Sequence, residues 1–154
     1  MRVPPVLLQL LALSAAISIT ACAGASDPPR VPTTTKCENP AACTLVLAAP
    51  AGFKLTLTGR SCDAINDQVA LTAPVAAVLT TDGCREPVGK VWDYSSPINP
   101  AGTEIVIEFT SDQYANPPGL KVTGAYPDWT ISFEDGGDQD FNDLVLAVNA
   151  VPAA

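Results

Sequence analysis

Short stretches in which apolar and polar residues alternate recur along most of the chain. Within residues 53–58, Phe, Leu and Leu alternate with Lys, Thr and Thr. Alternation of this kind indicates β-strands with one core face and one solvated face, because successive side chains of a strand point to opposite sides. The pattern predicts about eight strands, at residues 44–48, 53–58, 75–80, 88–94, 104–110, 120–124, 129–134 and 144–148.

Turn-forming residues separate the predicted strands, as in the proline-containing segments 49–52, 95–102 and 116–119. This spacing is typical of an all-β, antiparallel β-sandwich of the jelly-roll or Ig-like kind. Residues 105–107 and 144–148 are apolar at every position, so we expect them to be central strands. No segment after the first 21 residues keeps a helical period, and the one helical turn that we expect lies near residues 63–69.

The first 21 residues have the composition of an export signal. One early charge, Arg2, precedes an apolar stretch that is shorter than the ~20 residues needed to span a bilayer. Ala21-Cys22 fits the cleavage site of a bacterial lipoprotein, so we expect Cys22 to carry the lipid and to hold the protein at the cell envelope membrane. The alternative is ordinary cleavage after Ala25, which would release a secreted protein.

The sequence after this signal divides into two parts. Residues 22–42 are rich in proline and threonine, which predicts a flexible tether. Residues 43–150 then form the single β-sandwich domain, and they are numerous enough to bury a core of their own.

Four cysteines follow Cys22, and they are Cys37, Cys43, Cys62 and Cys84. An even number of cysteines in an exported chain predicts two structural disulfides. Three pairings are possible, and we favour Cys37–Cys43 across a short turn, with Cys62–Cys84 closing a longer loop. A zinc site of four thiolates is the rival interpretation, and the absence of any C-x-x-C pair argues against it.

Composition excludes several classes of function. The formal net charge is −8, whereas a protein that binds nucleic acid needs a basic patch. The chain contains no histidine, which excludes Ser-His-Asp and Cys-His catalysis and histidine-ligated zinc. Acids are plentiful enough for the carboxylate pair of a glycoside hydrolase, but five of the sixteen crowd one hairpin, whereas that chemistry needs two carboxyls flanking a substrate cleft. We therefore expect a protein that is not an enzyme.

Five of the sixteen acidic residues lie within residues 134–143, between the last two predicted strands. Carboxylates so close repel one another unless a cation lies between them, and Ca²⁺ takes about six to eight oxygen ligands. We therefore predict a Ca²⁺ site, with ligands Asp135, Asp138, Asp140, Asn142 and Asp143. Glu134 is expected to face solvent. The rival interpretation is a solvated loop whose Asp and Asn side chains satisfy turn backbone groups.

An EF-hand is excluded as the frame of this site. Asp138, Asp140 and Asn142 have the spacing that opens an EF-hand loop, but the sixth position is Asp143 where that loop needs glycine. The twelfth position is Asn149 where it needs glutamate.

Residues 133–145, F-E-D-G-G-D-Q-D-F-N-D-L-V, resemble the C-terminal signature of an uncharacterised domain family of bacterial surface and secreted proteins. That signature has F-E-D, a short glycine-rich stretch, D-x-D-[FY]-N-D and an apolar strand. The resemblance is close over these residues and loose over residues 99–150. It implies a β-sandwich, a calcium site and a role in adhesion.

Two functions fit these features. In the first, Ca²⁺ locks the last hairpin of a structural or adhesive module. In the alternative, the module binds carbohydrate through Ca²⁺, with coordination positions open to a glycan beside an aromatic such as Trp92 or Trp129. Tryptophan in a β-module is more often a core residue than a sugar platform.

Overall fold

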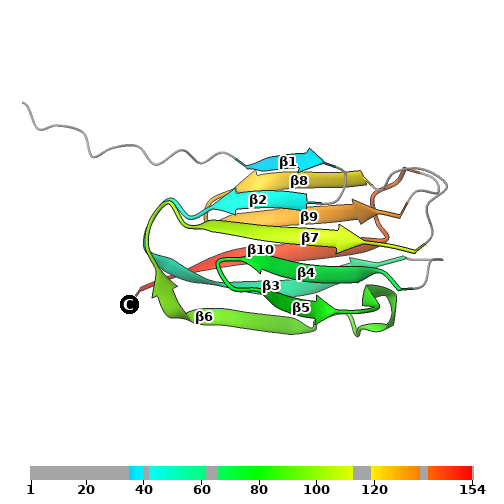
Figure 1. Ribbon diagram of the computed structural model, residues 1–154, viewed down its shortest axis with the longest axis horizontal. Coiled ribbons are helices and arrows are strands. Elements are labelled where there is room, and N and C mark those ends of the chain that lie inside the picture. Colours follow the sequence, from blue (N-terminus) through cyan, green and yellow to red (C-terminus); the bar gives the residue numbers. More distant parts are fainter. Residues whose placement is uncertain (1–34, 40–41, 62–65, 113–118, 136–138, 154) are drawn as a thin grey trace, which may run out of the picture.

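The computed structural model describes residues 35–39, 42–61, 66–112, 119–135 and 139–153, which form an antiparallel β-sandwich of two five-stranded sheets (Figure 1). The first sheet has the order β1 (Lys36–Asn39), β2 (Ala42–Val46), β7 (Glu104–Thr110), β4 (Gln68–Ala73), β5 (Ala77–Thr80). The second has the order β6 (Val91–Asn99), β3 (Ala51–Arg60), β10 (Leu144–Pro152), β9 (Asp128–Glu134), β8 (Gly119–Ala125). The predicted fold class is confirmed.

The core lies between the two sheets and follows from the alternation in the sequence. On β3, Phe53, Leu55 and Leu57 are at most 1% exposed. The rings of Phe109 on β7 and Phe133 on β9 stack across the two sheets with centroids 4.4 Å apart. Burial of each such side chain contributes roughly 1.5–3 kcal/mol, so this interleaved layer holds the sheets together.

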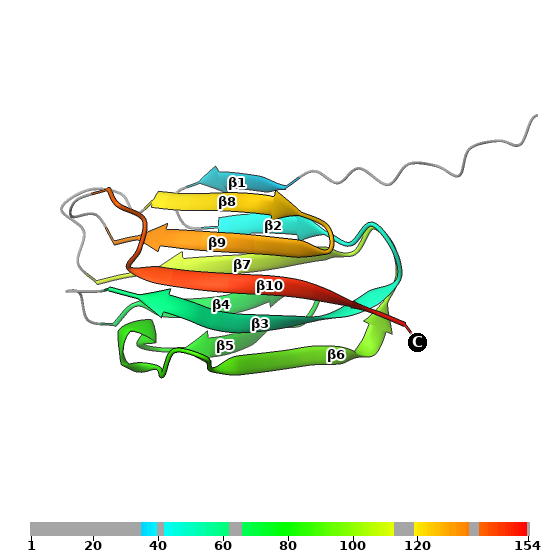
Figure 2. The same ribbon diagram turned by 180° about the vertical axis from the view of Figure 1, so that it is seen from behind.

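The two strands predicted to be central are central. β7 is the third strand of the first sheet and β10 is the third strand of the second (Figure 2). β10 pairs with β3 along its whole length and with β9 from Leu144 to Asn149. In both strands the residues that face the core are buried, and those that face outward are half-buried or exposed.

Two local predictions are wrong, and a third is tested only in part. β1 lies inside the segment predicted to be a tether. The helical turn predicted near residues 63–69 falls partly outside the described residues, and its last two residues belong to β4, which begins at Gln68. β6 continues to Asn99, through residues predicted to form a turn. β1 and β6 are edge strands, and an edge strand is held mainly by backbone hydrogen bonds to one neighbour, so its sequence need not alternate.

A disulfide fixes β1 to β2. Cys37 and Cys43 are directly opposite in the register, and their sulfurs are bonded at 2.03 Å. This predicted pairing is confirmed. Cys62 lies outside the described residues, so Cys62–Cys84 stays a prediction, as do the roles of Cys22 and of the first 34 residues.

Every pair of neighbouring strands is antiparallel, and in both sheets odd-numbered strands alternate with even-numbered ones. All odd-numbered strands therefore end at the same end of the sandwich, at the right in Figure 1. We call this the loop end, because the connections that follow β3, β5, β7 and β9 meet there. Among the described residues there is no α-helix, and no helix long and apolar enough to cross a membrane.

Candidate cation site at the loop end

The β9–β10 hairpin positions two acids opposite each other. Phe133 pairs with Leu144 as the last register pair of the hairpin. Glu134, the last residue of β9, and Asp143, which directly precedes β10, come next on either side. The strand register therefore brings their backbones together before the loop begins, which makes their proximity a property of the sheet.

Three carboxylates converge at this point. Glu134, Asp135 and Asp143 each have a ligand atom within 4.8 Å of those of the other two. Glu134 is 3% exposed and Asp143 is 7% exposed. Two oxygens bound to one Ca²⁺ at ~2.3–2.6 Å lie at most about 5 Å apart. The three carboxylates can therefore share one ion without a large rearrangement.

Backbone N–H groups orient two of these carboxylates. The Asp135 N–H donates to Asp143 Oδ2 at 2.7 Å, and the Phe141 N–H donates to Glu134 Oε2 at 3.1 Å. Phe141 has a positive φ of 58°, a left-handed conformation that is uncommon for residues other than glycine. The loop thus folds back over Glu134 at the expense of some backbone strain.

The surroundings of Asp143 disfavour an ionised carboxylate that has no cation beside it. The pKa of Asp143 is raised to about 6, mainly by burial and in addition by the like charges of Asp135, Glu134 and Asp140. The hydrogen bond from the Asp135 N–H works in the opposite direction. A group with these surroundings gains either from a proton or from a cation.

The five predicted ligands differ in where they lie. The carboxylates of Asp135 and Asp143 lie close together, whereas Asp138 lies outside the described residues. The Asn142 N–H donates to Asp140 Oδ1 at 3.1 Å, and the Asn142 side-chain amide donates to Asp140 Oδ2. Asp140 and Asn142 therefore bond to each other in a local turn at the rim of the hairpin loop.

The expectation that Glu134 faces solvent is wrong. Alternation along β9 places Glu134 opposite in direction to Phe133, on the outer face of a strand. Glu134 is nonetheless buried, because Gly119 on β8 pairs with it and the Phe141 ring lies over Gly119. The alternation along a strand cannot predict this burial, because the covering ring of Phe141 comes from a loop.

A further buried acid, Asp67, was not predicted from the sequence. Asp67 is fully buried in the connection between β3 and β4. Burial raises its pKa; a hydrogen bond from Ser111 opposes the shift, and the charges of Asp143, Asp82 and Asp112 add to it. Within the described ranges, however, the hairpin acids form the one group of three whose ligand atoms are close enough to share a metal.

Two hollows are lined by described residues. A polar hollow of about 440 Å³ at the loop end is lined by Asn66, Thr80, Thr81, Asp82, Arg85 and Glu86. A smaller, mainly apolar hollow of about 320 Å³ is lined by Phe53, Pro74, Val75, Tyr94, Ser96, Pro97 and Asn99.

Neither tryptophan is an open platform. Trp129 is 3% exposed, in the core. Trp92 is partly buried, its Nε1–H donates to the Leu79 carbonyl at 2.9 Å, and Lys90 Nζ lies 5.4 Å from its ring centroid.

No protein-family model and no curated protein sequence matches the chain. Among solved structures, the chain is similar to a Chromobacterium violaceum lectin in complex with alpha-methyl-fucoside. The two are 17% identical with a TM-score of 0.45, over 72% of this chain and 96% of the lectin chain.

Proposed function

We propose that this protein is a non-catalytic β-sandwich module that binds Ca²⁺ in the β9–β10 hairpin. The observation that supports the proposal is the convergence of Glu134, Asp135 and Asp143, two of them almost fully buried. Removing carboxylates from water costs several kcal/mol for each ion unless an opposite charge compensates it. A divalent cation supplies that compensation at the place where the three side chains meet.

The remaining oxygens of a Ca²⁺ shell have sources nearby. Three side chains provide fewer than the roughly six to eight oxygens that Ca²⁺ takes. Asp138, Asp140 and Asn142 follow within the same loop, and backbone carbonyls and water can fill other positions. These three residues are therefore part of the proposed ligand set.

The role of the ion in this proposal is structural. β10 is the central strand of its sheet, and the Ser61 N–H donates to the Asp143 carbonyl at 3.1 Å. An ion held by Glu134 and Asp143 would tie the end of β9 to the start of β10, and through Ser61 to the end of β3. The loop end would then be stiffened without any change in the core.

The cellular location and role of the module are proposed from the sequence. We propose that the protein is exported and anchored by a lipid on Cys22, and that it acts in adhesion at the cell surface. The alternative function is Ca²⁺-dependent carbohydrate binding. The polar hollow at the same end of the sandwich supports the carbohydrate-binding part of this alternative, because it offers a place for a glycan.

A thermal melt of the purified protein in EGTA and in 1 mM Ca²⁺ tests the proposal. An ion present at about 100 times its dissociation constant stabilises the folded state by about 2.7 kcal/mol. This corresponds to a rise of roughly 10 °C in melting temperature for a domain of this size. Mg²⁺ serves as the ion control, since it demands a tighter octahedral shell.

Asp128→Asn is the matched variant for this melt. Asp128 begins β9 at the opposite end and accepts from the Asn149 side-chain amide at 2.8 Å, which asparagine can still do. We expect Asp128→Asn to keep the full calcium shift and Asp135→Asn to lose most of it. An unchanged melting temperature of the native protein at millimolar Ca²⁺ would refute the calcium proposal.

A further inference from the structure

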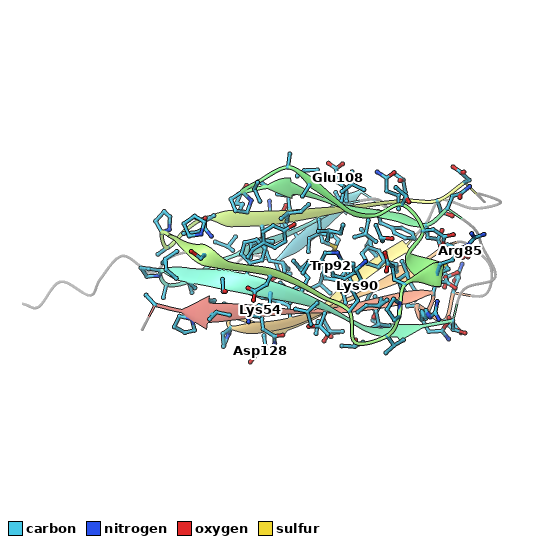
Figure 3. All side chains as sticks on the ribbon, turned by 90° about the horizontal axis from the view of Figure 1, so that it is seen from below. Lys54, Arg85, Lys90, Trp92, Glu108 and Asp128 are labelled. Atoms are coloured by element: carbon cyan, nitrogen blue, oxygen red, sulfur yellow. A yellow bond between two sulfur atoms is a disulfide. The ribbon has the colours of Figure 1, made fainter. Side chains whose placement is uncertain are left out.

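The polar hollow at the loop end is distinct from the cation site. Its lining comes from Asn66, at the entry to β4, and from the 80–86 segment between β5 and β6, whereas the cation site belongs to the β9–β10 hairpin. Figure 3 shows Arg85 at this end of the molecule, with Lys54 and Asp128 well away from it. The volume of about 440 Å³ falls in the range of small-ligand sites, which is roughly 300–1,000 Å³.

The charges around the hollow are balanced. Arg85 Nε lies 2.8 Å from Asp82 Oδ2, and Lys90 Nζ lies 2.7 Å from Glu86 Oε2. The hydrogen bond from Lys90 lowers the pKa of Glu86, which therefore stays a carboxylate. Each acid thus has its own base, so the hollow carries no uncompensated charge that would select a metal ion or an anion.

The lining is also held in place. The Gly83 N–H donates to the Asp67 carbonyl at 2.7 Å, which fixes the short 3₁₀ helix Gly83–Arg85 against the β3–β4 connection. The Asp82 N–H donates to Thr80 Oγ1 at 3.2 Å, and Asn66 Nδ2 donates to Asp112 Oδ2 at 2.8 Å. A lining ordered before binding loses little conformational entropy when a ligand arrives.

The chemistry of the lining selects a ligand class. Carboxylate and amide oxygens accept hydrogen bonds, the guanidinium donates them, and the two threonine hydroxyls do both. All six lining residues are polar, which disfavours an apolar ligand. We propose that this hollow binds a neutral, hydroxyl-rich ligand, a saccharide, directly through side chains. This inference rests on the carbohydrate-binding alternative of the proposed function and changes it in one respect, because the sugar lies in the hollow and does not bind the cation.

Titration calorimetry with neutral methyl glycosides tests the assignment. The probes are the methyl α-glycosides of mannose, glucose, galactose and fucose, each added to the purified protein in Ca²⁺ and again in EGTA. We expect at least one glycoside to bind with millimolar affinity, because the lining lacks an aromatic face. Arg85→Met and Thr81→Val should each weaken that binding about tenfold, since each removes a group that hydrogen-bonds the ligand.

Lys54→Met is the matched control. Lys54 is also a partly exposed base in an ion pair, 2.8 Å from Asp93, and its loss should leave glycoside binding unchanged. Both hollow variants should keep the native calcium-induced rise in melting temperature, so a failure here is separable from a failure of the calcium proposal. Absence of binding by all four glycosides at 50 mM would overturn the inference. Binding that is abolished by EGTA and unaffected by Arg85→Met and Thr81→Val would also overturn it, and would place the sugar on the cation.

Discussion

Asp143→Asn should make the metal-free protein more stable at neutral pH. In the native protein without Ca²⁺, the folded state raises the pKa of Asp143 from 3.8 to about 6. A group with a raised pKa adds stability that is fully present below pH 3.8 and is lost as the pH rises through 6. Asparagine removes the charge, and its side-chain oxygen can still accept the Asp135 N–H.

The size of this effect follows from the shift. A difference of about 2 pKa units corresponds to roughly 3 kcal/mol between acidic and neutral pH. Asp143 is only 7% exposed, so little of this is lost to solvent screening. In EGTA, the native protein should lose on the order of 10 °C in melting temperature between pH 4.5 and pH 8.

The assay is a series of thermal melts in EGTA across that pH range, repeated in 1 mM Ca²⁺. In EGTA, the melting temperature of Asp143→Asn should fall much less with rising pH than that of the native protein. Addition of Ca²⁺ should no longer raise it. Some decline will persist, because burial raises the pKa of Asp67 as well. Calcium should flatten the native profile near pH 7, since the ion replaces the proton. An equal fall in melting temperature of the native protein and of Asp143→Asn in EGTA would show that Asp143 is not the source of the pH dependence.

Two further predictions concern the frame of the sandwich. Gly52→Ala should destabilise the domain by about 2–3 kcal/mol in urea unfolding, because a Cβ there would clash with the Ser95 backbone. Gly59→Ala, on the same strand, would place its Cβ 3.5 Å from Val145, an ordinary contact, and should be close to neutral. Equal losses of stability in the two variants would argue against the close approach of β3 and β6. Replacing both Cys37 and Cys43 by serine should cost about 2 kcal/mol, as a short disulfide loop predicts, and an unchanged urea midpoint would mean that strand pairing alone fixes β1.

The sequence predicts the fold better than it predicts the site, for a physical reason. Strands such as β7 and β10 bury every second side chain in the core, and this leaves a pattern along the chain. Edge strands such as β1 need only a backbone neighbour and leave none. The hairpin acids were predictable because five of them are consecutive or nearly so.

Burial of single acids follows other rules. Glu134 is buried by the returning Phe141 loop, and Asp67 by segments distant in sequence. The polar hollow likewise combines Asn66 with the 80–86 segment. Contacts of this kind form only once the strands have taken their places in the sheets, so no local sequence pattern predicts them.

The alternation of strand direction gives the molecule two poles. β1 is an odd-numbered strand, so the described chain enters the sandwich at the pole opposite the loop end, and β10 finishes at that same entry pole (Figure 1). The ten residues of β3 span about 33 Å at ~3.3 Å per residue. A contact made at the entry pole would therefore leave the acidic hairpin and the polar hollow roughly 30 Å away, where they can meet a second partner.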